Sequence, residues 1–566
     1  MGVARFEKLR NVSPKTWLRL TALAVFIPAV VIVVNLHWFF IQVPNAVGFD
    51  DGAAAALGQR VAAGHWLPYV DGCSHRGPLL YWLMAVVEWL SGSHPWLGIR
   101  IFMLLVGLLT AGALFGTGLA AKKPIGGAAG ALVWIYFWLA GETASAFAVT
   151  GEAIAAAFGL VAVMTMAWAL LSAQKLRSRI ILLALSGAFA ACAGMVKQTA
   201  FAVSGPLALW ALAGSLSLEG ESRRARWTLL LSFFGGIAAT VAIILLRYVI
   251  AGQLKAFWYW FYVYNAKIYM GPYKNKPFKP AFLGFFRGHT WAIGALVIVS
   301  IWGLARPIGE IKKARGILRG YADAGLEVTA SLLLLLVFAA VSSPQRFWPP
   351  YYVMVYPFVG LLVGVRVGEL AEKAQGTLTA RIISQLVLGA LLASFVGWTA
   401  SWKLDRLVAE KKKGDWKAAQ PDPLCATIDK YSKPGDRLFI WGFDSRFNVT
   451  CHRVPATRFA FMTLVAGAVP PFWKDLRKDR IARDARKDLM ADLEASKPPV
   501  ILDITGKMRG VSLRVVPELS RYVDGRYCPM GVVRSKDGTA GKMYVRKGIV
   551  DCTPRPPPLL TPNPIN

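Results

Sequence analysis

The chain has 566 residues, of which 55% are hydrophobic and only 17% are charged, and its mean hydropathy is +0.46. Soluble globular proteins rarely have this balance, so the composition indicates an integral membrane protein. The net charge of +32 comes from Lys and Arg residues between apolar runs and in the last third, which argues against nucleic acid as a partner. Anionic membrane lipids, a phosphorylated lipid carrier or an acidic glycan would each account for this surplus.

The first apolar segment extends from Leu20 to about Val43 and follows a basic stretch between Met1 and Arg19. It is longer than the core of a signal peptide, and no small-residue cleavage site closes it. We therefore interpret it as a retained membrane span whose basic flank stays in the cytoplasm.

Windows of roughly twenty apolar residues predict further spans along the chain. They lie near 97–120, 126–141, 151–173, 180–196, 199–215, 228–249, 283–305, 326–343, 350–366 and 382–400. A total of about eleven spans agrees with the charge pattern, because the connections rich in Lys and Arg all fall on one side. With a cytoplasmic N-terminus, everything after Ala400 is then predicted to be exported.

The outer connections contain apolar segments that are too short to span. We expect 53–64 and 79–91 to form helices that lie along the membrane surface. The aromatic connection 250–282 is typical of an interfacial belt, in which Trp and Tyr side chains anchor the protein at the headgroups.

The composition becomes polar from about residue 402, which predicts a transmembrane domain over 1–401 and a small extracytoplasmic α/β domain over 402–566. Within this second domain the pattern predicts strands at 437–441 and 500–504 and helix in 474–495. A Pro-rich tail follows from Pro554.

Four cysteines lie in the predicted exported domain, where an oxidising compartment favours disulfides. We expect two disulfides, and the sequence leaves the three pairings open. Zinc binding is the weaker interpretation, because the spacings are wide and His452 is the only histidine of this domain. The four residues are Cys425, Cys451, Cys528 and Cys552.

Three acidic residues are candidates for catalysis. Asp50 and Asp51 follow the first span at the predicted outer boundary, where adjacent carboxylates make each other's ionisation costlier, so that either is a candidate general base. The alternative is a helix N-cap or a solvated loop acid. Glu152 opens the span 151–173 on the same side, either as a functional group or as a partner of the helix dipole.

Three cations are predicted on this outer side. Arg76 precedes a Gly-Pro break, and its planar guanidinium suits either a phosphate or a lipid headgroup. Lys197 lies between two short apolar segments, where an ammonium requires a partner: a phosphate, Glu152 or a helix C-terminus. Arg346 is the third cation, in the connection before the span 350–366.

These segments resemble the bacterial glycosyltransferase family 39 relatives with the GT-C fold, which include protein O-mannosyltransferases and the aminoarabinose transferase of lipid A. The similarity is most specific in the first outer loop. It is carried there by Phe49-Asp50-Asp51-Gly52, Leu67-Pro68-Tyr69-Val70-Asp71 and His75-Arg76-Gly77-Pro78-Leu79-Leu80-Tyr81-Trp82, and elsewhere by Glu152, Val196-Lys197-Gln198, Arg346–Pro357, Pro434-Gly435-Asp436-Arg437, Trp441-Gly442 and Arg453–Phe459.

The pattern departs from the family at three places. Arg76 stands where the family usually has Lys, Gly77 replaces a Pro, and Pro350 replaces a His. Residues 52–56 also differ from the family after the acidic pair, so the family's acid corresponds to either Asp50 or Asp51.

The resemblance implies a GT-C-like polytopic helical fold in a bacterial inner membrane and a polyprenyl-phosphate-linked sugar as donor. It implies an inverting transfer to an extracytoplasmic hydroxyl, with Asp50 or Asp51 as base and Glu152 as an orienting group. Donor phosphate would be bound by the three cations, and the resemblance implies no obligatory metal. Contacts to acceptor or lipid are expected from His75, Tyr81 and Tyr351.

Two other function classes remain open at this point. A transporter of a lipid carrier or glycan would place ionisable residues deep in the spans and often has repeated halves, and we find no internal repeat. A non-catalytic protein of envelope assembly would use the exported domain for binding. The sugar, the prenyl length, the oligomeric state and the acceptor, whether glycan, lipid or protein, are likewise open.

Overall fold

The computed structural model describes residues 14–41, 49–140, 149–270, 321, 324–344, 349–373, 422–468, 475–504, 511–536 and 538–552. By their contacts the residues divide into two compact units. The first comprises 1–43, 100–252 and 273–416, and the second comprises 44–99, 253–272 and 417–566. The second unit thus combines the segments 44–99 and 253–272 with the C-terminal segment.

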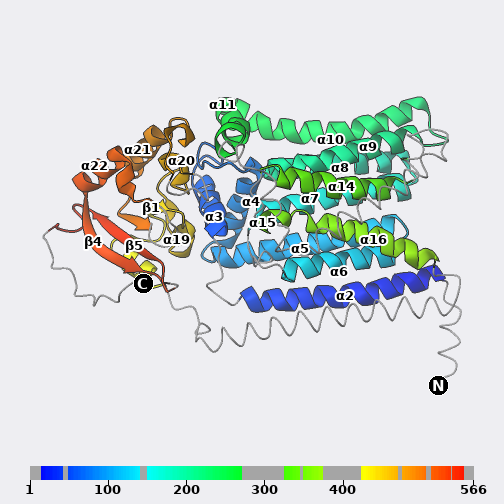
Figure 1. Ribbon diagram of the computed structural model, residues 1–566, viewed down its shortest axis with the longest axis horizontal. Coiled ribbons are helices and arrows are strands. Elements are labelled where there is room, and N and C mark those ends of the chain that lie inside the picture. The colour runs from blue at the N-terminus through cyan, green and yellow to red at the C-terminus, as the bar shows by residue number, and fades with distance from the viewer. Residues whose placement is uncertain are drawn as a thin grey trace, which may run out of the picture. The chain divides into compact units, whose positions relative to one another are not determined.

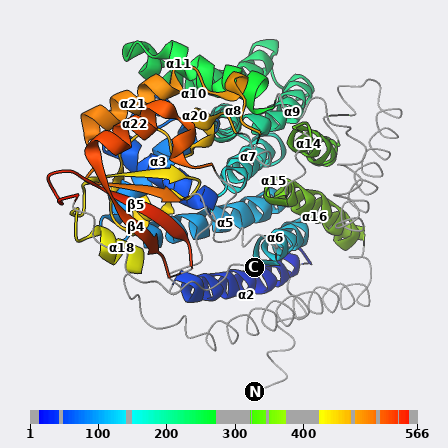
Figure 2. The ribbon, with the colours of Figure 1, turned by 60° about the vertical axis from the view of Figure 1, so that its left-hand side comes forward.

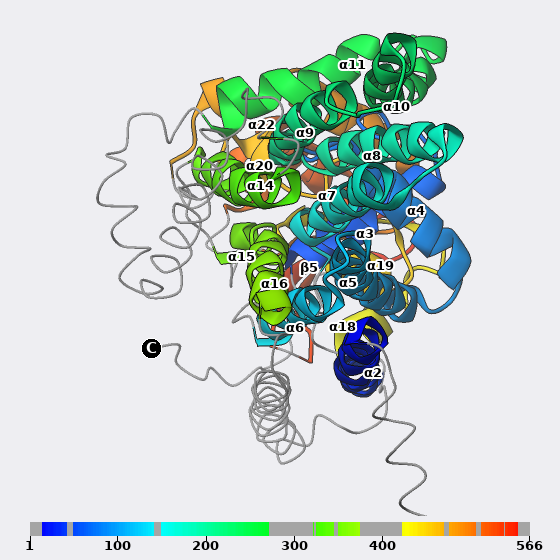
Figure 3. The same ribbon diagram turned by 90° about the vertical axis from the view of Figure 1, so that its right-hand side faces the viewer.

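The first unit is helical, and its long helices run side by side (Figures 1 and 3). Its helices pack in sequence-local pairs, such as α7 with α8 and α8 with α10, and in distant pairs, such as α6 with α16. The elements are α2 (Pro14–Ile41), α5 (Pro95–Ala120, shared with the second unit at its start), α6 (Pro124–Ala140), α7 (Gly151–Ala167), the π-helical turn Trp168–Ser172, α8 (Leu176–Val196), the 3₁₀ segment Gln198–Val203, α9 (Ser204–Leu216), α10 (Arg223–Ile250), α14 (Gly325–Ser342), α15 (Pro349–Tyr352) and α16 (Tyr356–Lys373).

Six helical segments of the described chain are long and apolar enough to cross a membrane, which supports the predicted polytopic membrane class. They are Pro95–Ala120, Gly151–Ser172, Leu176–Val196, Gln198–Leu216, Arg223–Ile250 and Gly325–Ser342. The predicted spans 283–305 and 382–400 lie outside the described residues. The total of eleven therefore stays a prediction, as does the domain boundary at 401/402, which also lies outside them.

One predicted span differs in its limits. The window 350–366 is divided into the short α15 and the longer α16, with a turn at 353–355 between them. Two consecutive prolines, Pro349 and Pro350, start α15, and Pro357 occupies the first turn of α16, where the missing N–H has no intrahelical partner to lose.

Close contacts between backbones fix the pairing of α6 and α16. A methyl group on Gly126 would lie 2.2 Å from the carbonyl oxygen of Gly364, and one on Gly130 would lie 2.6 Å from that of Gly360. Side chains larger than hydrogen do not fit at this separation. The spacing of four residues on each helix therefore forms a small-residue seam of the kind common between membrane helices.

The second unit contains α3 (Phe49–Ala62) and α4 (Pro78–Ser91), which pack against each other, and the aromatic segment α11 (Leu254–Trp258), continued by the π-helical Tyr259–Tyr269. Gly58 permits the α3–α4 contact, because a methyl group there would lie 2.5 Å from Cβ of Met84. Both α3 and α4 have 14 residues, about 21 Å of helix, which is shorter than a bilayer core.

The C-terminal part of this unit contains one five-stranded sheet in the order β2-β1-β3-β5-β4. Figure 2 labels its last two strands, β5 and β4. Strands β2 (Val454–Pro455), β1 (Arg437–Gly442) and β3 (Val500–Ile504) are parallel, while β5 (Ala540–Arg546) and β4 (Tyr527–Arg534) are antiparallel neighbours. All five residues of β3 are buried, as an inner strand with both faces covered requires. The predicted strands 437–441 and 500–504 are confirmed.

Short helices surround the sheet, among them α18 (Pro423–Ile428), α19 (Arg446–Thr450), α20 (Thr463–Ala466), α21 (Ala485–Ser496) and α22 (Pro517–Arg526). The helix predicted in 474–495 is found as α21, which begins at Ala485, and the 3₁₀ turn Lys478–Arg480 precedes it. Asp484 has a left-handed backbone with φ of 56°, which a helix cannot continue through.

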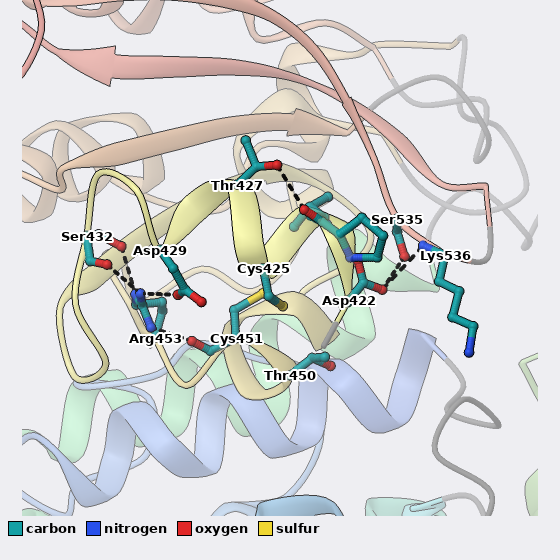
Figure 4. Close-up of a disulfide and its surroundings, with 12 residues drawn as sticks. Asp422, Cys425, Thr427, Asp429, Ser432, Thr450, Cys451, Arg453, Ser535 and Lys536 are labelled. Carbon is teal, nitrogen blue, oxygen red and sulfur yellow. Dashed lines mark hydrogen bonds and ion pairs between the residues drawn. A yellow bond between two sulfur atoms is a disulfide. The ribbon is translucent and has the colours of Figure 1, made fainter. Parts of the chain in front are cut away.

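Two disulfides join Cys425 to Cys451 and Cys528 to Cys552. Figure 4 shows the first bridge between α18 and the end of α19. Beside it, the buried Arg453 donates to Ser432, to Asp429 and to the carbonyl of Cys451, at distances between 2.6 and 2.7 Å. Of the three disulfide pairings that the sequence left open, the structure has Cys425–Cys451 with Cys528–Cys552.

Candidate functional site

The loop between α3 and α4 is folded around Asp71. Its carboxylate accepts hydrogen bonds from the backbone N–H groups of His65 at 2.9 Å and Leu67 at 2.8 Å. Tyr69 takes a left-handed conformation with φ of 71°, and its amide donates to the carbonyl of Gly72 at 2.8 Å. The loop is therefore a structured element and holds the following residues, 75 and 76, in a defined place.

An ion pair connects the end of this loop to the first turn of α3. The Nη2 atom of Arg76 lies 3.1 Å from Oδ1 of Asp50, which is in the first turn of α3. The Arg76 side chain is only 11% exposed, whereas that of Asp50 is 54% exposed. A largely buried cation thus faces a carboxylate that water or a substrate can reach.

The neighbouring Asp51 differs in its surroundings, since it is only 3% exposed. An acid that must take a proton from a substrate has to be reachable by it. Of the two carboxylates that the sequence left equivalent, Asp50 is the one with an accessible side chain.

Contacts from the loop itself and from the aromatic segment hold the His75–Arg76 dipeptide in place. The Tyr69 hydroxyl donates to the carbonyl of Arg76 at 2.6 Å, and Asn265 Nδ2 donates to the carbonyl of His75 at 2.7 Å. The His75 ring stacks on Tyr269, with 4.0 Å between the ring centroids. The guanidinium is therefore presented by a dipeptide that is fixed from both sides.

Tyr81, on α4, is fully buried beside this dipeptide. Burial raises the pKa of Tyr81 to about 12, opposed by the positive charge of Arg76 and by a hydrogen bond with Ser74. Its phenol stays protonated at physiological pH, so it can act as a neutral hydrogen-bonding group. Its 1% exposure gives no direct surface for a substrate contact.

A second acid–base pair lies in the first unit. Glu152, in the first turn of α7, forms an ion pair with Lys197 at the end of α8, and both side chains are largely buried. The Lys197 ammonium also lies 4.4 Å from the centre of the Tyr351 ring. The structure thus brings three of the predicted site residues together and gives Lys197 the protein partner considered from the sequence.

Local sequence explains how Glu152 is presented. Thr150 caps α7, with its side chain accepting from the Ala153 N–H at 3.3 Å. The carboxylate therefore lies at the positive end of the helix dipole. Arg346, the third predicted cation, lies outside the described residues.

Three residues near Arg76 were not predicted as parts of the site: Tyr69, Asn265 and Tyr269. Tyr69 lies in the same loop as Arg76, whereas Asn265 and Tyr269 contact His75 from a distant segment, 190 residues away in the case of Asn265. The aromatic richness of 250–282 was the available signal, but the prediction assigned it to membrane anchoring. In the described part of the chain, no cluster of three His, Cys, Asp or Glu side chains could hold a metal ion.

No family model and no curated protein sequence matches the chain. Among solved structures, it is similar to ArnT from Cupriavidus metallidurans in the apo state, with a TM-score of 0.51 and 16% identity over 92% of this chain and 97% of ArnT. The same ArnT bound to undecaprenyl phosphate gives a TM-score of 0.49 at 14% identity, covering 94% and 98% of the two chains.

A further similar structure is the oligosaccharyltransferase of Archaeoglobus fulgidus in the apo form. Its TM-score is 0.47 at 12% identity, covering 92% of this chain and 74% of that one. The likeness to apo ArnT shows a shared fold over nearly the whole of both chains. The predicted GT-C-like fold is thereby confirmed.

Proposed function

We propose that this chain is an inverting glycosyltransferase that moves a sugar from a polyprenyl-phosphate-linked donor to a hydroxyl of an extracytoplasmic acceptor. The observation that carries the proposal is the pairing of the accessible Asp50 with the largely buried Arg76. A base that takes the proton of the acceptor and a cation that binds the leaving phosphate are the two groups that a single displacement at a sugar phosphate uses, and here they belong to one site. The shared fold with ArnT supports it.

In the proposed reaction, Asp50 accepts the proton of the acceptor hydroxyl while the oxygen of that hydroxyl bonds to the anomeric carbon. The bond from that carbon to the phosphate oxygen breaks, and the electron pair leaves with the polyprenyl phosphate. Arg76 stabilises the negative charge of the departing phosphate through charge-assisted hydrogen bonds. Attack opposite the leaving group inverts the sugar, and no residue of the chain forms a covalent intermediate.

The other proposed roles follow from residue type and surroundings. Glu152 and Lys197 form a second charged pair for donor or acceptor recognition, with Tyr351 beside the ammonium. His75 supplies an aromatic contact to acceptor or lipid. Arg346 is proposed as a further phosphate ligand, and membrane lipids surround the chain in a bacterial inner membrane, with 402–566 on the outer side.

Substitution of the acids and the cation tests the proposal in purified protein in lipid nanodiscs. We expect Asp50→Asn to lower kcat by about 100-fold to 10,000-fold, the usual contribution of a general base. Asp51→Asn is the matched control at the next position, and we expect it to retain most of its transfer activity. Full activity of Asp50→Asn would show that Asp50 is not the general base.

Binding is measured separately, with undecaprenyl phosphate as the probe. We expect Arg76→Ala to weaken its binding at least tenfold, because the guanidinium is the proposed phosphate ligand. Asp50→Asn should bind the probe as well as the wild type or better, since it removes a negative competitor for Arg76. An unchanged affinity of Arg76→Ala would contradict phosphate recognition at this residue.

A further inference from the structure

The C-terminal domain touches the helix that carries the proposed base at one very close point. A methyl group on Gly52 would lie 2.4 Å from Cβ of Arg446 and 2.7 Å from its Cα and backbone nitrogen. These atoms belong to the backbone and its first side-chain atom, so they cannot turn away as the end of a flexible side chain would. Gly52 immediately follows Asp50 and Asp51, so this contact lies within the first turn of α3.

Arg446 is itself fixed within the C-terminal domain. Its Nε atom lies 2.8 Å from Oδ1 of the buried Asp444, and its Nη2 donates to the hydroxyl of the buried Thr539 at 3.1 Å. The residue begins α19, so that its side chain ties the start of this short helix to the turn between β4 and β5.

The rest of α19 is also held. The side chain of Asn448 donates to the carbonyl of Leu438 in β1 at 3.0 Å, which joins the helix to the sheet. Its C-terminal end is closed by the disulfide between Cys451 and Cys425 (Figure 4). The surface that Gly52 meets is therefore a rigid one.

A second point of attachment lies at the other end of α3. The Arg60 side chain donates to the carbonyl of Pro455 in β2 at 2.7 Å and forms an ion pair with Asp492 of α21 at 3.5 Å. Two attachments, at positions 52 and 60, determine both the place and the direction of a 14-residue helix. The intervening contact of Gly58 with α4 does not involve the C-terminal domain.

We propose that α19 is a positioning element of the transferase, and that Gly52 is the positioning residue through which the C-terminal domain sets the place of the Asp50 carboxylate. The proposal rests on the proposed function for its catalytic consequence, but the contact it invokes is tested without activity. Any residue larger than glycine at position 52 moves the first turn of α3 away from α19 and draws Asp50 from its place beside Arg76.

The kinetic test compares Gly52→Ala with Gly58→Ala, a substitution on the same helix that meets an equally close neighbour, Met84, away from the carboxylates. We expect Gly52→Ala to lower kcat at least tenfold while KM for the lipid-linked donor stays within twofold, because Arg76 keeps its own backbone contacts. Gly58→Ala should lower kcat less than threefold at a similar melting temperature. Equal losses of kcat in both variants would overturn the positioning role.

A double-mutant cycle with Arg446→Ala identifies the partner. Arg446→Ala removes the side-chain contacts to Asp444 and Thr539, so α19 can move away from position 52. Gly52→Ala should therefore lower kcat by a smaller factor in this background than in the wild type. The effects of Gly58→Ala and Arg446→Ala should multiply instead. If the effects on kcat multiply for Gly52→Ala with Arg446→Ala as well, the contact does not act through Arg446.

Hydrogen–deuterium exchange of the full-length protein in nanodiscs tests the contact without any substrate. We expect amides of 50–57 to exchange at least threefold faster in Gly52→Ala than in the wild type, and to be unchanged by Gly525→Ala, where a methyl group meets open space. Unchanged exchange in Gly52→Ala overturns the proposal. If the wild type transfers no sugar but the exchange differs as expected, the transferase assignment fails while the positioning of Asp50 by α19 stands.

Discussion

The folded protein disfavours the protonated form of His452. It follows the disulfide-bonded Cys451 with a left-handed backbone at φ of 53°. Burial lowers the pKa of His452 below its usual value of 6.5, and the positive charges of Arg453 and His94 add to this effect, against the opposing charge of Asp429. The unfolded chain therefore binds a proton at this residue more readily than the folded chain does.

This difference predicts a loss of stability in acid. The stabilisation is present above pH 6.5 and is lost as the pH falls below 6.5 towards the lower pKa of the folded state. His452→Asn removes the titrating ring, and Asn tolerates the left-handed backbone. We expect the melting temperature of the variant to fall less than that of the wild type between pH 7.5 and pH 5.5. Equal declines in calorimetry would exclude His452 as a source of acid sensitivity.

At the scale of residues, the sequence predicted the chemical groups better than their partners. Asp50 and Arg76 were candidates from residue type and position alone, and the sequence left a helix cap and a lipid headgroup open as their structural alternatives. That Asp50 is accessible and Asp51 is buried depends on how α3 packs, which no local pattern records. The partners Asn265 and Tyr269 come from a different connection, so only the folded chain shows them.

At the scale of elements, the small-residue seam between α6 and α16 can be tested directly by substitution of its glycines. Gly364→Ala places a methyl group 2.6 Å from the carbonyl oxygen of Gly126, so the two helices must separate. Overpacking of this kind costs about 1–3 kcal/mol. We expect a lower melting temperature in detergent, whereas the control Gly235→Ala on α10, where a methyl group meets open space, should be neutral. An equal melting temperature for both variants would show that the seam yields without cost.

The sequence predicted the first and last residues of an element well where an apolar composition alone determines them. The windows 151–173 and 326–343 correspond closely to the observed Gly151–Ser172 and Gly325–Ser342, because long apolar runs have few alternatives to helix in a bilayer. The start of α21 could not be read in this way. The left-handed Asp484 interrupts a polar, helix-compatible stretch whose sequence contains no glycine or proline to mark the break.

At the scale of the whole molecule, the two disulfides predict a simple count of thiols. Under denaturing but non-reducing conditions, we expect alkylation at Cys73 and Cys192 only, and at all six cysteines after reduction. Mass spectrometry of the purified protein measures both states. Alkylation of Cys425 or Cys528 without a reductant would contradict the pairing.

Removal of one bridge extends this test to stability. The double variant Cys425→Ser/Cys451→Ser loses a cross-link with a sequence separation of 26 residues, for which roughly 2–4 kcal/mol is typical. We expect the tryptophan fluorescence transition in denaturant to move to lower concentration, with Cys192→Ser as the control. A transition that does not move would show that packing alone holds α18 against α19.

The joining of the loop region 44–99 to the C-terminal segment has a consequence for biosynthesis. The hydrogen bond from Arg60 to Pro455 spans 395 positions, so one partner leaves the ribosome long before the other. At translation rates of about 5–20 residues per second, the loop waits roughly 20–80 s for the strand it binds. Throughout that interval α3 has neither of its two attachments. The segment that carries Asp50 can therefore reach its final place only after the chain has been made as far as Pro455, so it is among the last parts of the protein to mature.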